Sequence, residues 1–428
     1  MTRPLLSARR NPLIIAALAA GFCHLVSTAH ADWTHYRGPT ANGVSADKLP
    51  TSIPKDGPKQ IWKASVGTGA SSMTVSGERV FTMGNVGGKD TVWCFNATTG
   101  AVVWKHEYPL DLDKRMFEGG TAATPTLDGG RVYTVSHQGD LFCLDAATGK
   151  QVWYKHYQKD FGGKRPQWGF AGSPTVEGNL VLLDVGGKGA STVALDKATG
   201  ATVWKSGDDG AGYASPVVAT IAGKKTVVVL KASQLVGLDL KDGKELWRSE
   251  WKTSYDVNAA TPLVMGDKIF VTSGYGSGCG LFEVTSSGVS YASGPGKLEN
   301  TAYSVSERWR NKNLKEHINS PVVFQGHVFG FDGQAGSGGQ LTCLDLASGA
   351  VKWQEKSVAG GSLVLADGKL ICLTEKGELV IGEASPGGFK LVSRSQVLGK
   401  RCWVQPTYAN GRVFCRNNDG DLVALELK

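Results

Sequence analysis

Apolar and polar residues alternate in short runs along this chain of 428 residues. Such alternation is typical of β-strands that bury one face. Glycine, Asp-Gly and Thr-Gly separate the runs, and these residues favour tight turns. Long stretches with the 3.6-residue period of a helix are missing from the sequence. The pattern therefore predicts an all-β protein made of many short antiparallel strands.

One unit recurs along the chain and is plainest at residues 144–153, LDAATGKQVW. Close relatives occupy residues 95–104, 195–204, 238–247 and 344–353. The Asp ends one strand and can hydrogen-bond the turn backbone, while the Gly supplies a left-handed turn position. The Trp then lies in the next strand, where its ring can cover a neighbouring sheet and its N–H can find a partner. Each unit therefore predicts a hairpin that leads into a Trp-bearing strand.

A second signature precedes each unit and consists of a small polar residue, a proline and alternating apolar residues. Copies with Ser or Thr before Pro lie at 124–125, 173–174, 215–216, 261–262 and 320–321. Gln405-Pro406 is a variant, and 71–72 and 361–362 fill the same slot without proline. These eight slots predict eight repeats, each forming one four-stranded sheet.

The repeat tryptophans and the chain ends suggest how the repeats close into a ring. The tryptophans are Trp104, Trp153, Trp204, Trp247, Trp309 and Trp353. The seventh repeat has no Trp, and we expect Phe389 to replace it. The eighth repeat ends at Lys428, before its outer strand could form, and the missing strand appears at residues 60–65. Pairing of strand 60–65 with the last repeat would close the ring and remove open sheet edges.

The N-terminal segment has the composition of a secretory signal peptide. Three arginines precede an apolar run at residues 13–20, and Ala-His-Ala at 29–31 gives a small-x-small cleavage pattern. We therefore expect a signal peptide at 1–31, a lead-in at 32–59, a propeller domain at 60–428, and a periplasmic or secreted product. No later stretch is long and apolar enough to span a bilayer.

The charge distribution and the cysteine positions limit the kinds of partner and site that the sequence predicts. The formal net charge is +8, and three of the positive charges lie in the signal segment. The remaining excess is dispersed, which does not favour nucleic-acid binding. Cys94, Cys143 and Cys343 occupy one repeat position, and Cys372 and Cys415 match each other. We therefore expect these thiols to be small core residues rather than disulfides or metal ligands.

The LDxxTGxxxW unit, followed by Ser/Thr-Pro at the start of the next repeat, resembles the pyrroloquinoline-quinone (PQQ)-like propeller family. That family includes the outer-membrane assembly lipoprotein BamB and the quinoprotein alcohol dehydrogenases. The resemblance covers residues 60–428, and DWTHYRGPTANGVS at 32–45 is similar to the lead-in of bacterial PQQ-like proteins. It implies an eight-bladed β-propeller of four-stranded antiparallel blades. A lipobox is missing, so no outer-membrane assembly role is predicted, and function must be argued from a site.

The resemblance also implies an enzymatic alternative, a PQQ-dependent alcohol or sugar dehydrogenase with PQQ and calcium as cofactors. In many such enzymes two adjacent cysteines form a disulfide over the quinone, and no two cysteines are adjacent here. Candidates for the floor under the quinone are Trp168, Trp251 and Trp403. Candidate calcium ligands are Asp256 with Asn258, or Glu316 with Asn319.

A binding site is expected where the chain crosses from each outer strand to the next repeat, because these crossings share one face at the mouth of the central channel. Aromatic and arginine side chains, which dominate binding hot spots, gather in these loops. The candidate ligand-binding residues are Arg165, Trp168, Tyr213, Asn258, His317, Asn319, Arg401 and Trp403. We expect the two arginines to favour an anionic group. His137 is expected to be exposed at a hairpin, and hairpins such as Lys376-Gly377 are expected on the opposite face.

The sequence favours a monomeric scaffold or recognition module that binds a protein or a small ligand. It predicts no catalytic residues, no metal site and no resident cofactor. A carbohydrate or surface-polymer binding protein is a further alternative, since the aromatic loops could stack on sugar rings.

Overall fold

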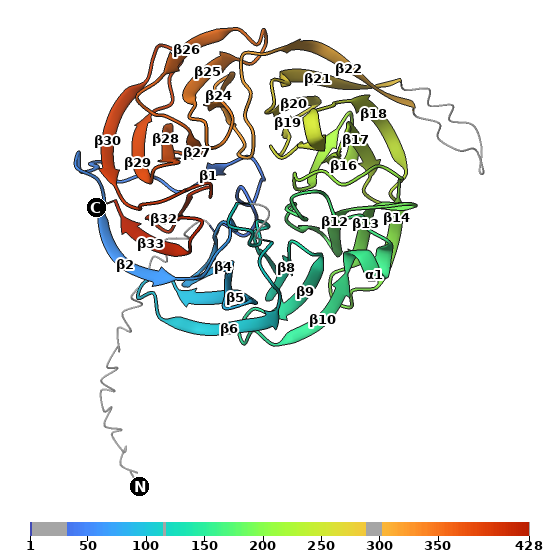
Figure 1. The fold of residues 1–428 in the computed structure, drawn as a ribbon, viewed down its shortest axis with the longest axis horizontal. Helices are drawn as coiled ribbons and strands as arrows, with labels where there is room; N and C mark the ends of the chain where they lie inside the picture. The colour runs from blue at the N-terminus through green and yellow to red at the C-terminus, as the bar shows by residue number, and fades with distance from the viewer. Residues whose placement is uncertain (2–31, 114–116, 288–301, 428) are drawn as a thin grey trace.

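Eight sheets form a closed ring around a central channel in the computed structural model (Figure 1). The structure describes residues 1, 32–113, 117–287 and 302–427. The predicted signal peptide lies outside these ranges apart from Met1. Among the described residues, no helix is long and apolar enough to cross a membrane.

The first four blades follow one another along the chain, each with its four strands in sequence order. Blade 1 consists of β3 (Thr74–Ser76), β4 (Arg79–Val86), β5 (Lys89–Asn96) and β6 (Val102–Pro109), and blade 2 of β7 (Thr126–Asp128), β8 (Arg131–Val135), β9 (Asp140–Asp145) and β10 (Gln151–His156). Blade 3 consists of β11 (Thr175–Glu177), β12 (Leu180–Gly187), β13 (Ala190–Asp196) and β14 (Thr202–Ser206), and blade 4 of β15 (Val217–Ile221), β16 (Lys224–Leu230), β17 (Gln234–Asp239) and β18 (Glu245–Glu250). Two short helical segments, α1 (Tyr157–Phe161) and η1 (Ser254–Asp256), lie in crossings between these blades.

Blades 5 to 7 repeat the pattern, and blade 8 combines the two ends of the chain. Blade 5 consists of β19 (Leu263–Met265), β20 (Lys268–Ser273), β21 (Gly278–Ser287) and β22 (Ala302–Asn311), and blade 6 of β23 (Val322–Phe324), β24 (His327–Asp332), β25 (Gln340–Asp345) and β26 (Val351–Glu355). Blade 7 consists of β27 (Gly361–Ala366), β28 (Lys369–Thr374), β29 (Glu378–Glu383) and β30 (Lys390–Gln396), with β1 (Val44–Ser45) added beside β27. Blade 8 consists of β31 (Thr407–Ala409), β32 (Arg412–Arg416), β33 (Asp421–Glu426) and β2 (Lys59–Ser65).

The predicted eight-bladed ring and its closure are confirmed. Strand β2 pairs antiparallel with β33, with Trp62 opposite Ala424 and Ser65 opposite Asp421. The ring is therefore closed by hydrogen bonds between strands that lie at opposite ends of the sequence, and neither strand is left with an open inner edge.

Trp104, Trp153, Trp204 and Trp309 each lie on the turn glycine of the next blade. A Cβ atom added at Gly149 would come within 2.5 Å of the Trp104 ring, and one at Gly200 within 2.8 Å of the Trp153 ring. Both glycines have a φ of 72°, the left-handed value that the repeat predicts. The Trp153 indole Nε1–H also donates to the carbonyl of Lys197 at 3.1 Å. Two constraints therefore require glycine at these positions. The backbone needs a left-handed φ, and the indole ring of the preceding blade leaves no room for a Cβ atom.

The ring-closing strand supplies the same contact for blade 8. Trp62 covers Gly100 of blade 1 and donates to the carbonyl of Ala97 at 3.0 Å. The ring also lies 6.1 Å from that of Phe95. The N-terminal strand therefore completes blade 8 and the junction between blades 8 and 1.

The expectation that Phe389 replaces the missing tryptophan of repeat seven is wrong. In the strand register, Ser393 holds the position that Trp occupies in the other blades. Its hydroxyl donates to the carbonyl of Pro54 at 2.5 Å, so the lead-in passes where an indole would otherwise lie. Phe389 packs instead beside Trp353 of blade 6, with 6.2 Å between ring centroids.

The second signature forms a belt of hydrogen bonds between blades. In each link a Ser or Thr hydroxyl oxygen accepts the backbone N–H of the equivalent residue in the preceding blade. The links, at 2.9 to 3.3 Å, join Ser72 to Thr124, Thr124 to Ser173, Ser173 to Ser215, Ser215 to Thr261 and Thr261 to Ser320. The following proline has no N–H that would need a partner in this crowded inner wall.

The lead-in crosses the channel. Trp33 exchanges backbone hydrogen bonds with Val75 of blade 1, and the backbone N–H of Leu127 in blade 2 donates to the carbonyl of Thr34. On the far side of the ring, the fully buried Arg37 donates to the carbonyl of Ser320 at 2.8 Å. In Figure 1 this segment, with β1, lies in the centre of the ring. The lead-in therefore obstructs the channel at the end away from the crossings.

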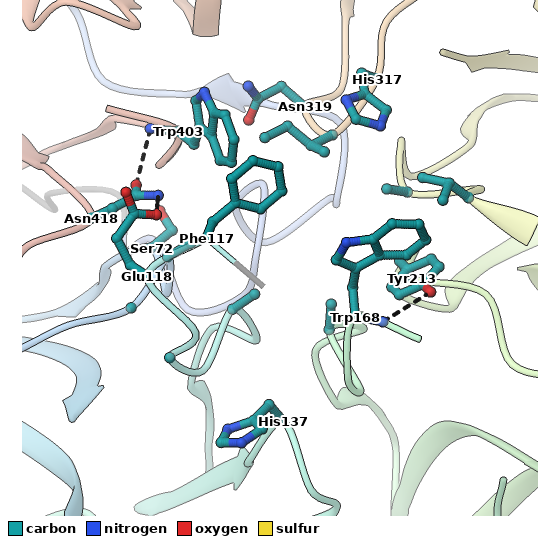
Figure 2. Close-up of a pocket in the computed structure, with 18 of the residues that line it drawn as sticks. Ser72, Phe117, Glu118, His137, Trp168, Tyr213, His317, Asn319, Trp403 and Asn418 are labelled. Atoms are coloured by element: carbon teal, nitrogen blue, oxygen red, sulfur yellow. Dashed lines mark hydrogen bonds between the residues drawn. The ribbon is translucent and has the colours of Figure 1, made fainter. Parts of the chain in front are cut away.

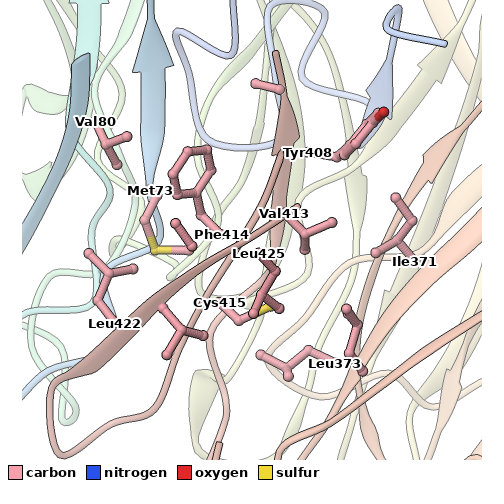
Figure 3. Packing of buried hydrophobic residues seen from close by; sticks show 14 of the residues in the cluster. Met73, Val80, Ile371, Leu373, Tyr408, Val413, Phe414, Cys415, Leu422 and Leu425 are labelled. Carbon is pink, nitrogen blue, oxygen red and sulfur yellow. The ribbon is translucent and has the colours of Figure 1, made fainter. Parts of the chain in front are cut away.

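The repeat-equivalent cysteines are core residues, as predicted. Cys94, Cys143 and Cys343 each lie opposite the Trp of the neighbouring strand, and all seven described cysteines are unpaired and buried. Cys415 packs in the core of blade 8 among the apolar side chains that Figure 3 shows. Burial raises the pKa of the Cys94, Cys143 and Cys343 thiols to about 12.

Truncating Trp153 to alanine should destabilise the protein by roughly 3–5 kcal/mol, because the ring is buried and nothing else fills its place over Gly200. Urea denaturation measures the loss. Val152→Ala on the same strand is the control, because Val152 is 40% exposed and should cost less than about 0.5 kcal/mol. A loss below about 1 kcal/mol for Trp153→Ala would contradict the inter-blade contact.

Deleting residues 32–66 should cause aggregation, since it removes β2 and exposes the edge of β33. Size-exclusion chromatography and a thermal melt of the truncated chain provide the measurement. A monomeric truncation that melts cooperatively would show that ring closure does not depend on this strand.

The thiols of Cys94, Cys143 and Cys343 should resist iodoacetamide in the native protein and react after unfolding in urea, because only the thiolate is reactive. Mass spectrometry of the alkylated peptides tests this. Rapid native labelling of all three cysteines, or a disulfide among them, would refute the core assignment.

Candidate functional site

The crossings and the middle hairpin of each blade lie on one face of the ring. In every blade the first three strands after a crossing are antiparallel and follow sequence order, so the chain returns to the crossing face after the second of them. The expectation that Lys376-Gly377 lies on the opposite face is therefore wrong. The adjacent Glu375 accepts a hydrogen bond at 3.1 Å from the indole Nε1–H of Trp403, which belongs to a crossing.

A cavity of about 220 Å³ opens at this face, at the mouth of the channel (Figure 2). Six of the eight predicted residues line it, namely Arg165, Trp168, Tyr213, His317, Asn319 and Trp403. Tyr36 of the lead-in also lines it, so the segment that crosses the channel forms its inner end. The cavity is thus a pocket with one mouth rather than an open pore.

One wall of the cavity contains Trp168, Tyr213, Tyr275 and His317, and Tyr255 connects these rings from outside the lining through edge-to-face contacts. The centroid distances are 6.1 Å between Trp168 and Tyr213, 6.3 Å between Trp168 and Tyr255, 5.4 Å between Tyr255 and Tyr275, and 4.9 Å between Tyr275 and His317. These rings come from crossings and hairpins of four successive blades, and such contacts hold them in defined orientations.

The facing wall is formed by Phe117 and Trp403, whose rings meet edge to face at 4.8 Å (Figure 2). The guanidinium of Arg401 lies 4.5 Å from the centroid of the Trp403 ring. The backbone N–H of Trp403 donates to the side-chain oxygen of Asn418 at 3.2 Å. Aromatic surface therefore borders the mouth on two sides.

Three of these aromatic residues have a strained backbone. Phe117, Tyr255 and Tyr275 have φ values of 53°, 61° and 52°, in the left-handed region that bulky residues rarely adopt. Phe117 and Tyr255 are also 62% and 66% exposed. Strain of this kind costs about 1–3 kcal/mol per residue and is concentrated at functional sites. The mouth therefore presents aromatic rings at the expense of local stability.

The charges around the cavity are paired. Arg165 binds Asp113 at 2.7 Å, and both side chains are largely buried. Arg401 forms an ion pair with Glu118, whose second carboxylate oxygen accepts from Asn418 at 3.2 Å. Each predicted anion-binding arginine thus already has a carboxylate partner, which removes the basis for the expected preference for anions.

The two histidines of the cavity, His137 buried and His317 half-buried, favour the neutral form. His137 is only 3% exposed, so the expectation that it is exposed is wrong. The reason is that the next crossing folds over it, with the backbone N–H of Phe170 donating to its carbonyl at 3.0 Å. Burial lowers the pKa of His137, and it lowers the pKa of His317 to about 4.

His137 and His317 differ in their hydrogen bonds. Nδ1 of His317 accepts from the backbone N–H of Ala335 at 3.3 Å. Neither ring nitrogen of His137 has a hydrogen-bond partner among the described residues, although both nitrogens are buried. A buried polar group without a partner is uncommon in native structures.

Two predicted site residues lie away from the cavity. Asn258 is fully buried, where its amide donates to the carbonyls of Lys231 and Trp251 and accepts from the Ser273 hydroxyl. It therefore holds a loop in place. Arg401 lies behind the Trp403 ring, where it supports the wall.

Sequence reasoning missed other cavity residues, including Tyr36, Tyr275, Gln405 and Asn418. Tyr275 lies in a glycine-rich hairpin, and Asn418 lies in another middle hairpin. The signal that could have located them is the antiparallel strand order itself, which brings every middle hairpin to the crossing face.

Asn258 and Trp251, two of the residues named for a PQQ–calcium site, do not fit such a site. The Asn258 side chain is committed to structural hydrogen bonds, and the candidate floor residue Trp251 is 1% exposed. Among the described residues, no three His, Cys, Asp or Glu side chains gather as metal ligands do.

Comparison with known proteins gives the family. A family model described as outer membrane protein assembly factor BamB matches residues 88–355 and 337–428. BamB from Moraxella catarrhalis is structurally similar, with a TM-score of 0.58 and 16% identity over 86% of this chain and 98% of that chain.

Quinohemoprotein alcohol dehydrogenases share the fold as well. The enzyme ADHIIG from Pseudomonas putida HK5 gives a TM-score of 0.53 and 11% identity over 93% of this chain and 80% of that chain. The enzyme from Comamonas testosteroni gives a TM-score of 0.50 and 14% identity over 92% and 80% of the two chains. No curated protein sequence matches. At such identities these structures show the fold alone, whereas the family model covers most of the chain, which therefore belongs to the PQQ-like β-propeller family described as outer membrane protein assembly factor BamB.

Proposed function

We propose that this chain is an exported binding module that holds part of a ligand or partner in the mouth cavity and carries out no catalysis of its own. The supporting observation is the pair of aromatic walls, Trp168 with Tyr213 on one side and Phe117 with Trp403 on the other. Aromatic rings that are positioned in advance supply large contact areas at low entropic cost. The inner end of the cavity at Tyr36 makes it a receptor for one inserted group.

Two further observations favour binding over dehydrogenase chemistry. Asn258 and Trp251, two of the side chains named for PQQ and calcium, are buried in structural roles. Both arginines at the mouth are paired with carboxylates, as in Arg165–Asp113, and burial favours the neutral form of His317 at neutral pH. A general acid or base needs a pKa near the working pH, and burial lowers the pKa of His317 to about 4.

Export rests on the signal-peptide composition of residues 1–31. The family description, an outer membrane assembly factor, agrees with a role outside the cytoplasm. We infer a periplasmic or secreted monomer that meets its ligand or partner there.

The double variant Trp168→Ala/Trp403→Ala should lose binding at the mouth, because it removes one ring from each wall. Isothermal titration calorimetry of the exported protein with N-acetyl-tryptophanamide and with neutral methyl glycosides measures this. The wild type should bind at least one probe, and the variant should bind it at least about tenfold more weakly. Both rings are partly exposed, so the melting temperature should change by less than about 3 °C.

The matched control is Val152→Ala/Val203→Ala, which alters exposed side chains on outer strands and should bind as the wild type does. Wild-type affinity in the tryptophan double variant, or no binding of any probe by the wild type, would contradict the proposal. A parallel assay adds PQQ and calcium and follows dye-linked oxidation of alcohols and sugars. Turnover in that assay would favour the dehydrogenase alternative instead.

A further inference from the structure

We infer that the group held in the mouth cavity is a neutral sugar ring at the end of a glycoside or glycan. This inference rests on the proposed function and specifies the chemistry of its ligand. It departs from the sequence-based expectation of an anionic ligand, because the structure shows how the charges at the mouth are paired.

Charge is the first argument. Arg165 is bound by Asp113, Arg401 is bound by Glu118, and the two histidines are uncharged at neutral pH. A carboxylate or phosphate entering the cavity would lose water without gaining an unpaired cation, which is unfavourable in a partly buried site. The cavity therefore suits a ligand without net charge.

Polar groups are the second argument. Asn319 and Gln405 donate from their amide nitrogens to the carbonyls of Gly361 and Leu363, which leaves their amide oxygens as acceptors. The hydroxyl of Tyr213 accepts from the backbone N–H of Trp168 and can still donate its own proton. Uncharged donors and acceptors at several points around one small cavity complement a ring that carries several hydroxyls.

His137 adds an independent observation. It lines the cavity, is 3% exposed, and has no hydrogen-bond partner at either ring nitrogen among the described residues. A neutral imidazole has one donor and one acceptor, the combination that a hydroxyl group satisfies. A ligand hydroxyl that reaches His137 would supply a partner that the described residues do not.

The aromatic walls and the size of the cavity complete the argument (Figure 2). The negative face of an indole attracts the weakly positive C–H groups on the flat face of a sugar ring. The aromatic side chain of a protein partner would stack equally well, but it offers at most one hydrogen-bonding group. A volume of about 220 Å³ is below the range for drug-sized ligands, and the lead-in obstructs the inner end, so one terminal ring enters.

The test compares sugars that differ by one charge. The methyl glycosides of glucose, galactose and mannose are titrated into the exported protein by calorimetry, together with the matching uronic acids. At least one neutral glycoside should bind, and its uronic acid should bind at least about tenfold more weakly. Equal binding of the two, or preference for the acid, would overturn the inference.

Asp113→Asn provides the matched change in the protein, because it releases Arg165 from its carboxylate. The ratio of uronic-acid to neutral-sugar affinity should then rise at least about tenfold. Asp128→Asn is the control, since it breaks the ion pair with Lys197, which lies near the opposite face, and should leave the ratio unchanged. A ratio that stays constant in Asp113→Asn while the fold is retained would contradict the charge argument.

His137→Phe keeps a ring but removes both nitrogens. Affinity for the neutral glycoside should fall at least about fivefold without a lower melting temperature, because the variant also removes two unpartnered polar atoms. Unchanged affinity would exclude His137 from the site.

The titrations distinguish a failure of the proposed binding site from a failure of the sugar inference. Binding of N-acetyl-tryptophanamide without any glycoside would support the mouth as a binding site and overturn the sugar inference. Binding of neither probe would overturn both proposals. Glycoside binding that persists in Trp168→Ala/Trp403→Ala would place the sugar elsewhere and would also contradict both.

Discussion

The contact between an indole ring and a turn glycine joins neighbouring blades at five junctions among the described residues, and the rest of the architecture depends on it. The glycine needs a left-handed φ for its turn, and a Cβ there would enter the ring, as Gly149 and Trp104 show. A turn and a neighbouring sheet therefore constrain the same residue. Trp62 makes this contact from the N-terminal strand, so the junction between the chain ends has the same geometry as the internal junctions.

Because every blade repeats the same strand order, a binding cavity forms at one face of the ring. Every crossing and every middle hairpin reaches the same side of the ring, so side chains from distant parts of the sequence meet there. Arg401 pairs with Glu118, and Trp403 meets Phe117, across almost three hundred residues. The rigid ring also tolerates strain in its loops, which is how Phe117, Tyr255 and Tyr275 keep unfavourable backbone angles at the mouth.

The fold was predictable from the sequence because its determinants are local and repeated. The turn glycine, the Trp and the Ser/Thr-Pro step recur at readable spacing, and so do the core positions of Cys94 and Cys143. The failures concern contacts between segments that no local pattern connects. Ser393 replaces the seventh Trp because the distant lead-in passes beside it. Likewise, the carboxylate that neutralises Arg165 lies 52 residues away.

The central claim is that the ring presents one cavity, walled by aromatic rings and balanced in charge, that receives a neutral ring. A crystal structure of the protein soaked with its tightest-binding methyl glycoside tests this most directly. The account predicts density for one sugar between Trp168 and Trp403, with hydroxyls within hydrogen-bonding distance of Asn319 and His137. A sugar bound outside the mouth, or a cavity that holds only water at saturating glycoside, would contradict it.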